Sequence, residues 1–181
     1  SGNSHDGTLF GPIDTNDRFG VPNSCFYFDG IDDYIVIPDS SKMKPSFPFS
    51  ISAWVKVDSF NNSVVVLVLS EETNTAYSGF WMSYSPSGQV NAGYGSGQGV
   101  STSYRRTRHS SSNIDTNAWY HLAVSFTGQS NIDIYINGVK SNGLISGGAS
   151  TIGYLGSGYE GVIGRNSALS GTTYHEGKID D

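Results

Sequence analysis

The stretch NIDIYINGV, residues 131–139, alternates isoleucines with polar residues and contains one acid, Asp133. A retaining glycosidase needs two carboxyl groups roughly 5 Å apart on the substrate side of such a strand. The neighbours of Asp133 on its own face are Asn131 and Tyr135, which cannot act as acid and base. This stretch therefore predicts an ordinary strand and not a catalytic one.

Acidic residues near both ends of the chain could bind a metal ion. They are the segment DGIDD at residues 29–33 and Asp180 close to the far end. Calcium takes six to eight oxygen ligands, from carboxylates and backbone carbonyls, and a glycine at a turn lets carbonyls point inward. The alternative is that these aspartates only stabilise turns, by bonding to their own backbone.

The segment SYRRTRHSS, residues 103–111, concentrates three of the ten basic residues of an acidic protein. Arg105, Arg106 and Arg108 could form paired hydrogen bonds with the carboxylates or sulfates of an anionic polysaccharide. The alternative is a strand edge that is protected by charge. If the segment is a strand, Tyr104, Arg106 and Arg108 share one face and Arg105 points away.

Aromatic side chains offer a second type of binding chemistry, because sugars stack their C–H faces on aromatic rings while polar groups fix the hydroxyls. Trp81, Tyr84 and Tyr94 lie on a predicted hairpin beside the basic segment. The ligand-binding residues that we predict are Trp81, Tyr84, Tyr94, Tyr104, Arg106 and Arg108.

Short strands must position these residues. The segments 49–58 and 119–127 alternate apolar and polar residues, and 63–70 contains a continuous apolar run typical of a strand buried on both faces. Asn137-Gly138 predicts a tight hairpin turn. Residues 95–118 are rich in Gly, Ser and Thr, and we expect a strand edge followed by a long loop. No segment shows a helical period, so the pattern indicates an all-β sandwich or barrel.

The bulk composition sets limits on partners. The 181 residues fit one domain, and the net charge of −6 makes nucleic acid an unfavourable partner. No apolar run is long enough to predict a membrane span. The single Cys25 has no partner for an internal disulfide and is expected to be a small buried residue.

Six motifs in order resemble the laminin-G-like, concanavalin A-like lectin/glucanase domains. They are FYFDGIDDYIVIPDS, FSISAWVKVD, WYHLAVSFTG, IDIYINGV, GVIGRN and HEGKIDD, and together they extend the resemblance over residues 1–181. The resemblance implies an antiparallel jelly-roll β-sandwich of two sheets, one of them concave. It also implies a non-catalytic, secreted or cell-surface, glycan-binding module beside other domains of a larger protein.

The resemblance further implies a structural calcium where the N-terminal turn meets the C-terminal strand. Carried over to this sequence, the ligands are Asp29 and Gly30 through their carbonyls and Asp180 through its side chain, with Asp32 as a further candidate. The family pattern continues past GKIDD into a last apolar strand. We therefore expect this domain, residues 1–181, to lack that strand or to receive it from elsewhere.

These observations predict a non-catalytic carbohydrate-binding domain with a structural calcium. The alternative is a protein-interaction or spacer module of a large secreted adhesin or enzyme. A glycoside hydrolase or lyase is the least favoured of the three functions, because none of the four glutamates lies in an alternating acidic motif.

Overall fold

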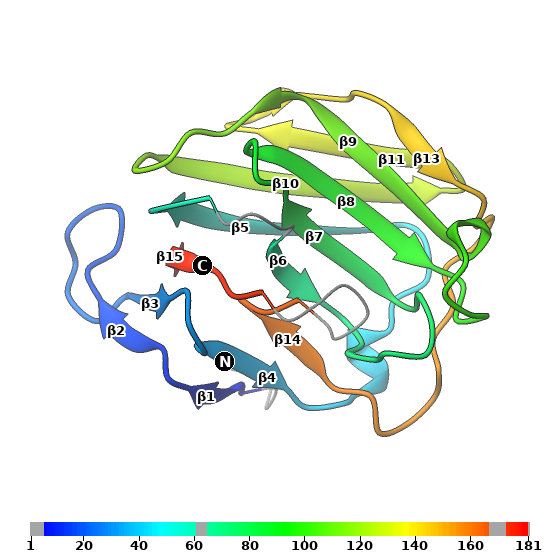
Figure 1. Ribbon diagram of the computed structural model, residues 1–181, viewed down its shortest axis with the longest axis horizontal. Helices are drawn as coiled ribbons and strands as arrows, with labels where there is room; N and C mark the ends of the chain where they lie inside the picture. The colour runs from blue at the N-terminus through cyan, green and yellow to red at the C-terminus, as the bar shows by residue number, and fades with distance from the viewer. Residues whose placement is uncertain (1–5, 61–64, 167–172, 181) are drawn as a thin grey trace.

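A computed structural model of the protein describes residues 6–60, 65–166 and 173–180. The fold is an antiparallel jelly-roll sandwich of two β-sheets that pack face to face (Figure 1). Among these residues, helix is limited to two single 3-10 turns, Ser41–Met43 and Thr102–Tyr104, and no helix could cross a membrane. The all-β prediction and the jelly-roll prediction are therefore confirmed.

The first sheet has eight strands. In spatial order they are β1 (Thr8–Phe10), β4 (Tyr34–Ile37), β14 (Gly161–Ile163), β6 (Val65–Leu69), β7 (Phe80–Tyr84), β8 (Gln89–Gly95), β9 (Arg105–Asn113) and β13 (Ile145–Gly147). Strands β7, β8 and β9 lie side by side in the upper half of Figure 1. The apolar run predicted as a buried strand is β6, in the middle of this sheet.

The second sheet has seven strands. In spatial order they are β12 (Val139–Lys140), β11 (Asn131–Ile136), β10 (Trp119–Gly128), β5 (Phe49–Val57), β15 (Glu176–Asp180), β3 (Cys25–Asp29) and β2 (Ile13–Thr15). Strands β5 and β10 pair over eight residues and carry the two alternating segments that the sequence predicts. Strand β15 brings the C-terminal segment between β5 and the N-terminal β3.

The core lies between the sheets, because every strand turns alternate side chains inward. Ile132 and Ile134 of β11 are fully buried, as the alternating pattern predicts. The eight-stranded sheet contributes Phe80 and other inward residues of β7 to this core. Within the seven-stranded sheet, Phe49 of β5 stacks on Phe126 of β10 with ring centroids 4.6 Å apart. Packed apolar and aromatic side chains thus hold the two sheets together.

The turn predicted at Asn137-Gly138 and the hairpin predicted to carry Trp81, Tyr84 and Tyr94 are both present. Asn137 and Gly138 have φ values of 51° and 78°, which is the positive pair that a type I′ hairpin turn needs. The amide oxygen of Asn137 also accepts the backbone N–H of His121 at 2.8 Å. The segment at residues 86–88 links β7 to β8, where Gly88 has a φ of 78°.

The prediction of a long loop over residues 95–118 is wrong. Residues 105–113 form β9, which pairs with β8 on one side and with β13 on the other. The segment lacks apolar residues because its inward positions are filled by arginines. Buried hydroxyls add further bonds, since Ser110 Oγ accepts the backbone N–H of Val90 at 3.0 Å.

Arg108 fastens β9 to the neighbouring chain segments. Its Nε donates to the carbonyl of Ile132 at 3.1 Å, and its Nη1 donates to the carbonyl of Gly143 at 2.9 Å. Arg106 acts in a similar way, because its Nε donates to the carbonyl of Ala149 at 2.7 Å. Both guanidinium groups therefore satisfy backbone carbonyls that the strand ladders leave free.

A buried polar pair lies in the core between the sheets. His175 is fully buried, and its Nδ1 lies 3.0 Å from the hydroxyl of Tyr84. Phe28 packs edge-on against the same imidazole, with centroids 5.6 Å apart. Burial lowers the pKa of His175 to about 4 and raises the pKa of Tyr84, so both groups are neutral at pH 7.

Replacing Arg108 by Gln should lower the free energy of unfolding by about 2 kcal/mol, because buried carbonyls lose charged donors. Urea denaturation measures this loss. Arg105→Gln is the matched control, since Arg105 neighbours this site in sequence but points to the opposite face. Equal stability of the Arg108 variant and the wild type would contradict the anchoring role.

His175 should make the protein less stable in acid. Its pKa in the folded state lies below the usual 6.5, so the unfolded chain binds the proton more readily. Stability is therefore lost as pH falls from 6.5 towards 4, by about 3 kcal/mol in all. Urea unfolding at several pH values should show this loss, and His175→Gln should reduce it. His121→Gln is the control and should keep the pH dependence of the unfolding free energy. If His175→Gln and His121→Gln show the same pH dependence, His175 is not its cause.

Candidate functional site

The outer face of the eight-stranded sheet carries the candidate binding site. Opposite residues on adjacent strands share a face. Trp81 of β7 lies opposite Gly93 of β8, and Gly93 lies opposite Thr107 of β9. Because Phe80 and Met82 point into the core, this row points out of it. The polar residues that share the outer face near Trp81 are Ser83, Asn91, Thr107, His109 and Ser146.

The indole of Trp81 lies flat against the sheet over Gly93. A Cβ atom at Gly93 would lie 2.6 Å from Cζ2 of Trp81 and 2.4 Å from the carbonyl oxygen of Arg106. Only glycine leaves room for the ring there. Tyr77 flanks Trp81 with ring centroids 6.2 Å apart, and the guanidinium of Arg105 lies 5.1 Å from the centre of the Tyr77 ring. The result is an aromatic platform with a cation at its margin.

Apolar residues lie on one side of this platform, where Trp81 packs against Leu69 and Val162, and polar groups lie on the other. The Nδ1 of His109 lies 2.6 Å from the amide oxygen of Asn91, and its Nε2 lies 3.4 Å from the hydroxyl of Ser146. Burial and the charge of Arg105 lower the pKa of His109, so its imidazole is neutral at pH 7. Two buried polar atoms, Oγ1 of Thr107 and Nε of Arg105, have no hydrogen-bond partner among the described residues.

This sheet lacks acidic residues altogether, since none of its eight strands contains Asp or Glu. Asp133, the one acid of the alternating stretch 131–139, lies on the other sheet. There its carboxylate bonds to Nζ of Lys140 at 2.9 Å and to Nδ2 of Asn142 at 2.6 Å. Its bond to Lys140 lowers the pKa of Asp133. Asp133 therefore stabilises the β11–β12 hairpin by its bonds to Lys140 and Asn142.

The structure separates the six residues predicted to bind ligand. Tyr84 and Tyr94 are 0% exposed and belong to the core. Arg106 lies opposite Tyr94 of β8 and Arg108 lies opposite Ala92, both core residues, so the two arginine side chains point inward and not to the outer face. Tyr104 ends the 3-10 turn before β9 and is half-buried. Trp81 alone lies on the outer face of the sheet.

Three residues near Trp81 were not predicted from the sequence: Tyr77, Asn91 and Thr107. Arg105 was considered with the basic segment but was not among the six predicted ligand-binding residues. The sequence did indicate that Arg105 points away from Arg106 and Arg108. It could not indicate which of the two faces is buried, because the basic segment contains no apolar residue to mark the core side.

An acidic cluster lies in the turn between β3 and β4. Ligand atoms of Asp29, Asp32 and Asp33 all lie within 4.8 Å of one another, and the cluster could hold a metal ion. Asp29 accepts the backbone N–H of Ile31 at 2.8 Å, while Asp33 accepts the backbone N–H of Asp29 at 2.8 Å. Burial and the two neighbouring carboxylates raise the pKa of Asp33. A cation would relieve this repulsion, and the all-oxygen donor set suits calcium.

The expected meeting of Asp180 with Asp29 and Gly30 does not occur. In the β3–β15 pair, Glu176 lies opposite Asp29, so Asp180 is four residues further along its strand, a distance of about 13 Å. Asp180 instead pairs with Nη1 of Arg18 at 2.5 Å. Gly30 turns at a φ of 79° directly against the side chain of Glu176.

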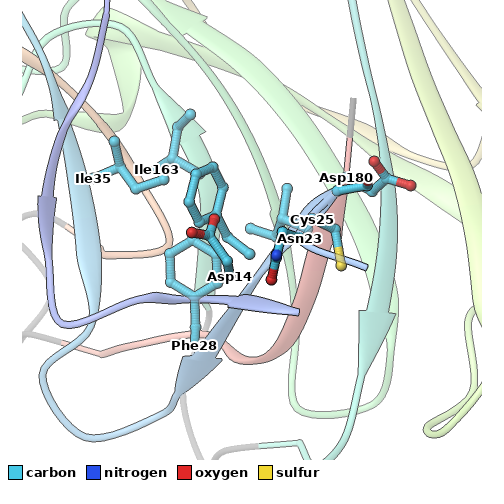
Figure 2. A pocket seen from close by; sticks show the side chains of 10 residues that line it. Asp14, Asn23, Cys25, Phe28, Ile35, Ile163 and Asp180 are labelled. Atoms are coloured by element: carbon cyan, nitrogen blue, oxygen red, sulfur yellow. The ribbon is translucent and has the colours of Figure 1, made fainter. Parts of the chain in front are cut away.

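A cavity of about 450 Å³ opens between the two sheets. Its apolar walls include Phe28, Ile35 and Ile163, which lie together on one side in Figure 2. Asn23 and Asp180 lie on the other side, near the end of β15.

The family assignment rests on the sequence. The family model described as "Concanavalin A-like lectin/glucanases superfamily" (Laminin_G_3) matches residues 29–181. No curated protein matches the chain.

Solved structures with the same fold are distant in sequence. The binding domain of Paraclostridial Mosquitocidal Protein 1 is 15% identical over 99% of this chain and 44% of its own, with a TM-score of 0.63. Trypanosoma rangeli sialidase is 16% identical over 97% of this chain and 26% of its own, with a TM-score of 0.59.

A third similar structure is a domain of a carbohydrate-active protein. Domain 4 of AbnA, an extracellular arabinanase from Geobacillus stearothermophilus, was solved with arabinotriose. It is 21% identical over 99% of this chain and 82% of its own, with a TM-score of 0.54. The chain spans less than half of the first two structures, so this fold occurs there as one part of a larger protein. From the family match and the observed jelly roll, the chain belongs to the concanavalin A-like lectin/glucanase superfamily.

Proposed function

We propose that the protein is a non-catalytic carbohydrate-binding module that holds a glycan on the outer face of its eight-stranded sheet. The observation that carries this proposal is the indole of Trp81, which lies over Gly93 with polar side chains on one side of it. An indole that shares its sheet face with hydroxyl, amide and imidazole groups can stack on the C–H face of a sugar while those groups bond its hydroxyls.

The charge on this face favours an anionic glycan. Arg105 lies at the margin of the platform, and the sheet supplies no carboxylate that would repel a uronate or a sulfate. The proposed contact differs from the one expected from the sequence, because Arg106 and Arg108 bind backbone carbonyls. Arg105 is the arginine of the basic segment that faces outward.

A binding role suits this site better than hydrolysis. A glycosidase needs a pair of carboxyl groups beside the bound sugar, and the eight strands contain none. The polar groups near Trp81 are hydroxyls, an amide and a neutral imidazole. They can orient a ligand by hydrogen bonds without supplying both an acid and a nucleophile.

Calcium is proposed as a structural ion at Asp29, Asp32 and Asp33. The three carboxylates lie within 4.8 Å of one another, and burial with the two neighbouring carboxylates raises the pKa of Asp33, so a bound cation would offset their repulsion. Bound there, the ion would fix the turn between β3 and β4. It lies away from Trp81 and would contribute to stability, not to sugar contact.

We further propose that the module acts outside the cell, beside other domains. The chain covers only 26% and 44% of two similar solved chains, which supports a position beside other domains. Exposed apolar side chains near the N-terminus favour a second role, packing against a neighbouring domain. They are Leu9, Phe10, Ile13, Phe19, Val21 and Ile31. A protein-interaction or spacer module is therefore the alternative function.

Replacing Trp81 by Ala should abolish or weaken glycan binding by at least tenfold, or about 1.4 kcal/mol, because the stacking platform is lost. A glycan array with neutral, uronic and sulfated polysaccharides, followed by calorimetry on the best ligand, measures the effect. Trp54→Ala on the other sheet is the matched control. Absence of binding by the wild-type protein, or equal losses in both variants, would refute the proposed face.

Arg105→Gln tests the preference for anionic glycans separately. This variant should lose its advantage for uronic or sulfated ligands and keep its affinity for neutral ones, because the platform is intact. Unchanged selectivity would show that Arg105 does not read the charge of the ligand.

Calcium should stabilise the wild-type protein against heat. At a concentration one hundred times the dissociation constant, the gain is about 2.7 kcal/mol. Asp32→Asn keeps the shape of the side chain and removes its charge, so the gain should shrink. Melting curves in calcium, magnesium and chelator measure it. An equal response of both proteins would exclude Asp32 as a ligand.

A further inference from the structure

Lys44 lies in a cage of oxygen atoms that come from three loops. Its Nζ is 2.6 Å from Oδ1 of Asp39 and 3.2 Å from Oε1 of Glu71, and it donates to the carbonyl of Gly156. Asp39 and Lys44 lie between β4 and β5. Glu71 lies just after β6, and Gly156 lies between β13 and β14. One ammonium group therefore joins three loops that are distant in sequence.

This ammonium compensates a buried negative charge. The side chain of Glu71 is 0% exposed. Burial disfavours the charged form of Lys44, but its bonds to Asp39 and Glu71 outweigh burial and raise the pKa of Lys44, so the group is charged at pH 7. Removal of one partner of a buried ion pair leaves the other charge uncompensated, which is strongly unfavourable. Without Lys44, Glu71 would have to bind a proton or move toward solvent.

The two carboxylates of the cage also bind the backbone of the β13–β14 loop. Oε1 and Oε2 of Glu71 accept the N–H of Leu155 at 3.3 Å and 3.0 Å. Oδ2 of Asp39 accepts the N–H of Gly158 at 2.6 Å. Together with the bond from the ammonium to the same loop, these contacts hold residues 155–158 in place.

The β13–β14 loop in turn contacts the strands that carry the candidate glycan site. The N–H of Gly153 donates to the carbonyl of Gly95 at the end of β8, and the carbonyl of Gly153 accepts the N–H of Gly79, each at 2.8 Å. The N–H of Gly95 also donates to the carbonyl of Gly79 at 2.9 Å. A Cβ atom at Gly95 would lie 2.1 Å from the carbonyl oxygen of Tyr77, so the backbone of Tyr77 lies directly against β8.

Tyr77 is the point where these contacts reach the aromatic platform. It lies in the segment between β6 and β7, as does the buried carboxylate of the cage. Its N–H donates to the carbonyl of Gly99 at 2.9 Å, and its carbonyl accepts the N–H of Gly97 at 2.8 Å. Its ring contacts both Trp81 and Arg105. A continuous path of bonds thus connects the cage to the platform.

We propose that Lys44 is a positioning residue for the glycan site. Its ammonium fixes Glu71 and the β13–β14 loop, and these in turn fix Tyr77 beside the platform. A binding surface that is fixed before the ligand arrives loses less conformational freedom on binding. Lys44 therefore raises the affinity without touching the ligand. The inference rests on the proposed glycan-binding function, because it concerns the same site.

Lys44→Ala tests whether the ammonium fixes Tyr77, because the space it leaves can hold the n-propylammonium ion. The amides of Tyr77 and Gly97 should exchange hydrogen about tenfold faster in the variant, relative to the amide of Ile134, which reports global unfolding. NMR measures these rates. n-Propylammonium in the buffer should restore slow exchange. 1-Propanol has a similar size but no charge and should not restore it.

Glycan affinity tests whether this positioning matters for binding. The probes are polygalacturonate, dextran sulfate and neutral dextran, measured by calorimetry. Lys44→Ala should bind the best of them about tenfold more weakly than the wild type and should recover with n-propylammonium. Lys42→Ala is the matched control, because it removes an exposed lysine two positions away, and it should bind like the wild type. Circular dichroism shows whether both variants are folded.

The outcomes separate this role from the glycan function. A wild-type protein that binds none of the probes would refute the glycan function, whatever the exchange rates show. If the wild type binds and Lys44→Ala binds equally well, the role of Lys44 is overturned and the glycan function is kept. Unchanged relative exchange at Tyr77 would also overturn it. So would equal rescue by 1-propanol, because the effect would then come from lost volume and not from lost charge.

Discussion

The alternation of side chains across the eight-stranded sheet decides what this protein can present to a ligand. Once Phe80, Met82 and Tyr84 of β7 join the core, regular pairing fixes the direction of residues 91–95 on β8 and 105–109 on β9. A shift of one residue would exchange the two faces completely. The arginines that fasten β9 and the residues around Trp81 are consequences of one register, so structural and binding roles alternate along the same short segment.

Much of the fold could be predicted from the sequence, because apolar alternation marks a buried face directly. The segments of β5, β10 and β11 and the turn at Asn137-Gly138 follow from local patterns. Strand β9 could not be recognised in this way. Its inward positions hold arginines whose carbonyl partners come from segments about 25 to 45 residues further along the chain. Burial of those arginines depends on tertiary contacts that composition does not reveal.

The candidate site was only partly predictable, for the same reason. An aromatic residue on a strand is equally consistent with a core position and with a sugar platform. On β7, Tyr84 is buried in the core, whereas Trp81 lies on the outer face over Gly93. Gly93 is as informative as the aromatic residues, because its missing side chain makes room for the indole. The acidic turn was recognised from Asp29 and Asp32, but the distant Asp180 depended on a strand register that sequence alone does not provide.

The absence of acids from the eight strands has a consequence for how the molecule meets a charged polymer. The net charge is −6, but the strands of the eight-stranded sheet contain no carboxylates, so the charge is distributed unevenly over the molecule. At long range a polyanion experiences the whole molecule and is repelled, whereas at contact it experiences Arg105. Salt screens the long-range repulsion more strongly than a partly buried contact. For the proposed anionic ligand, added salt would therefore weaken the long-range repulsion more than the contact with Arg105, and low ionic strength would favour separation.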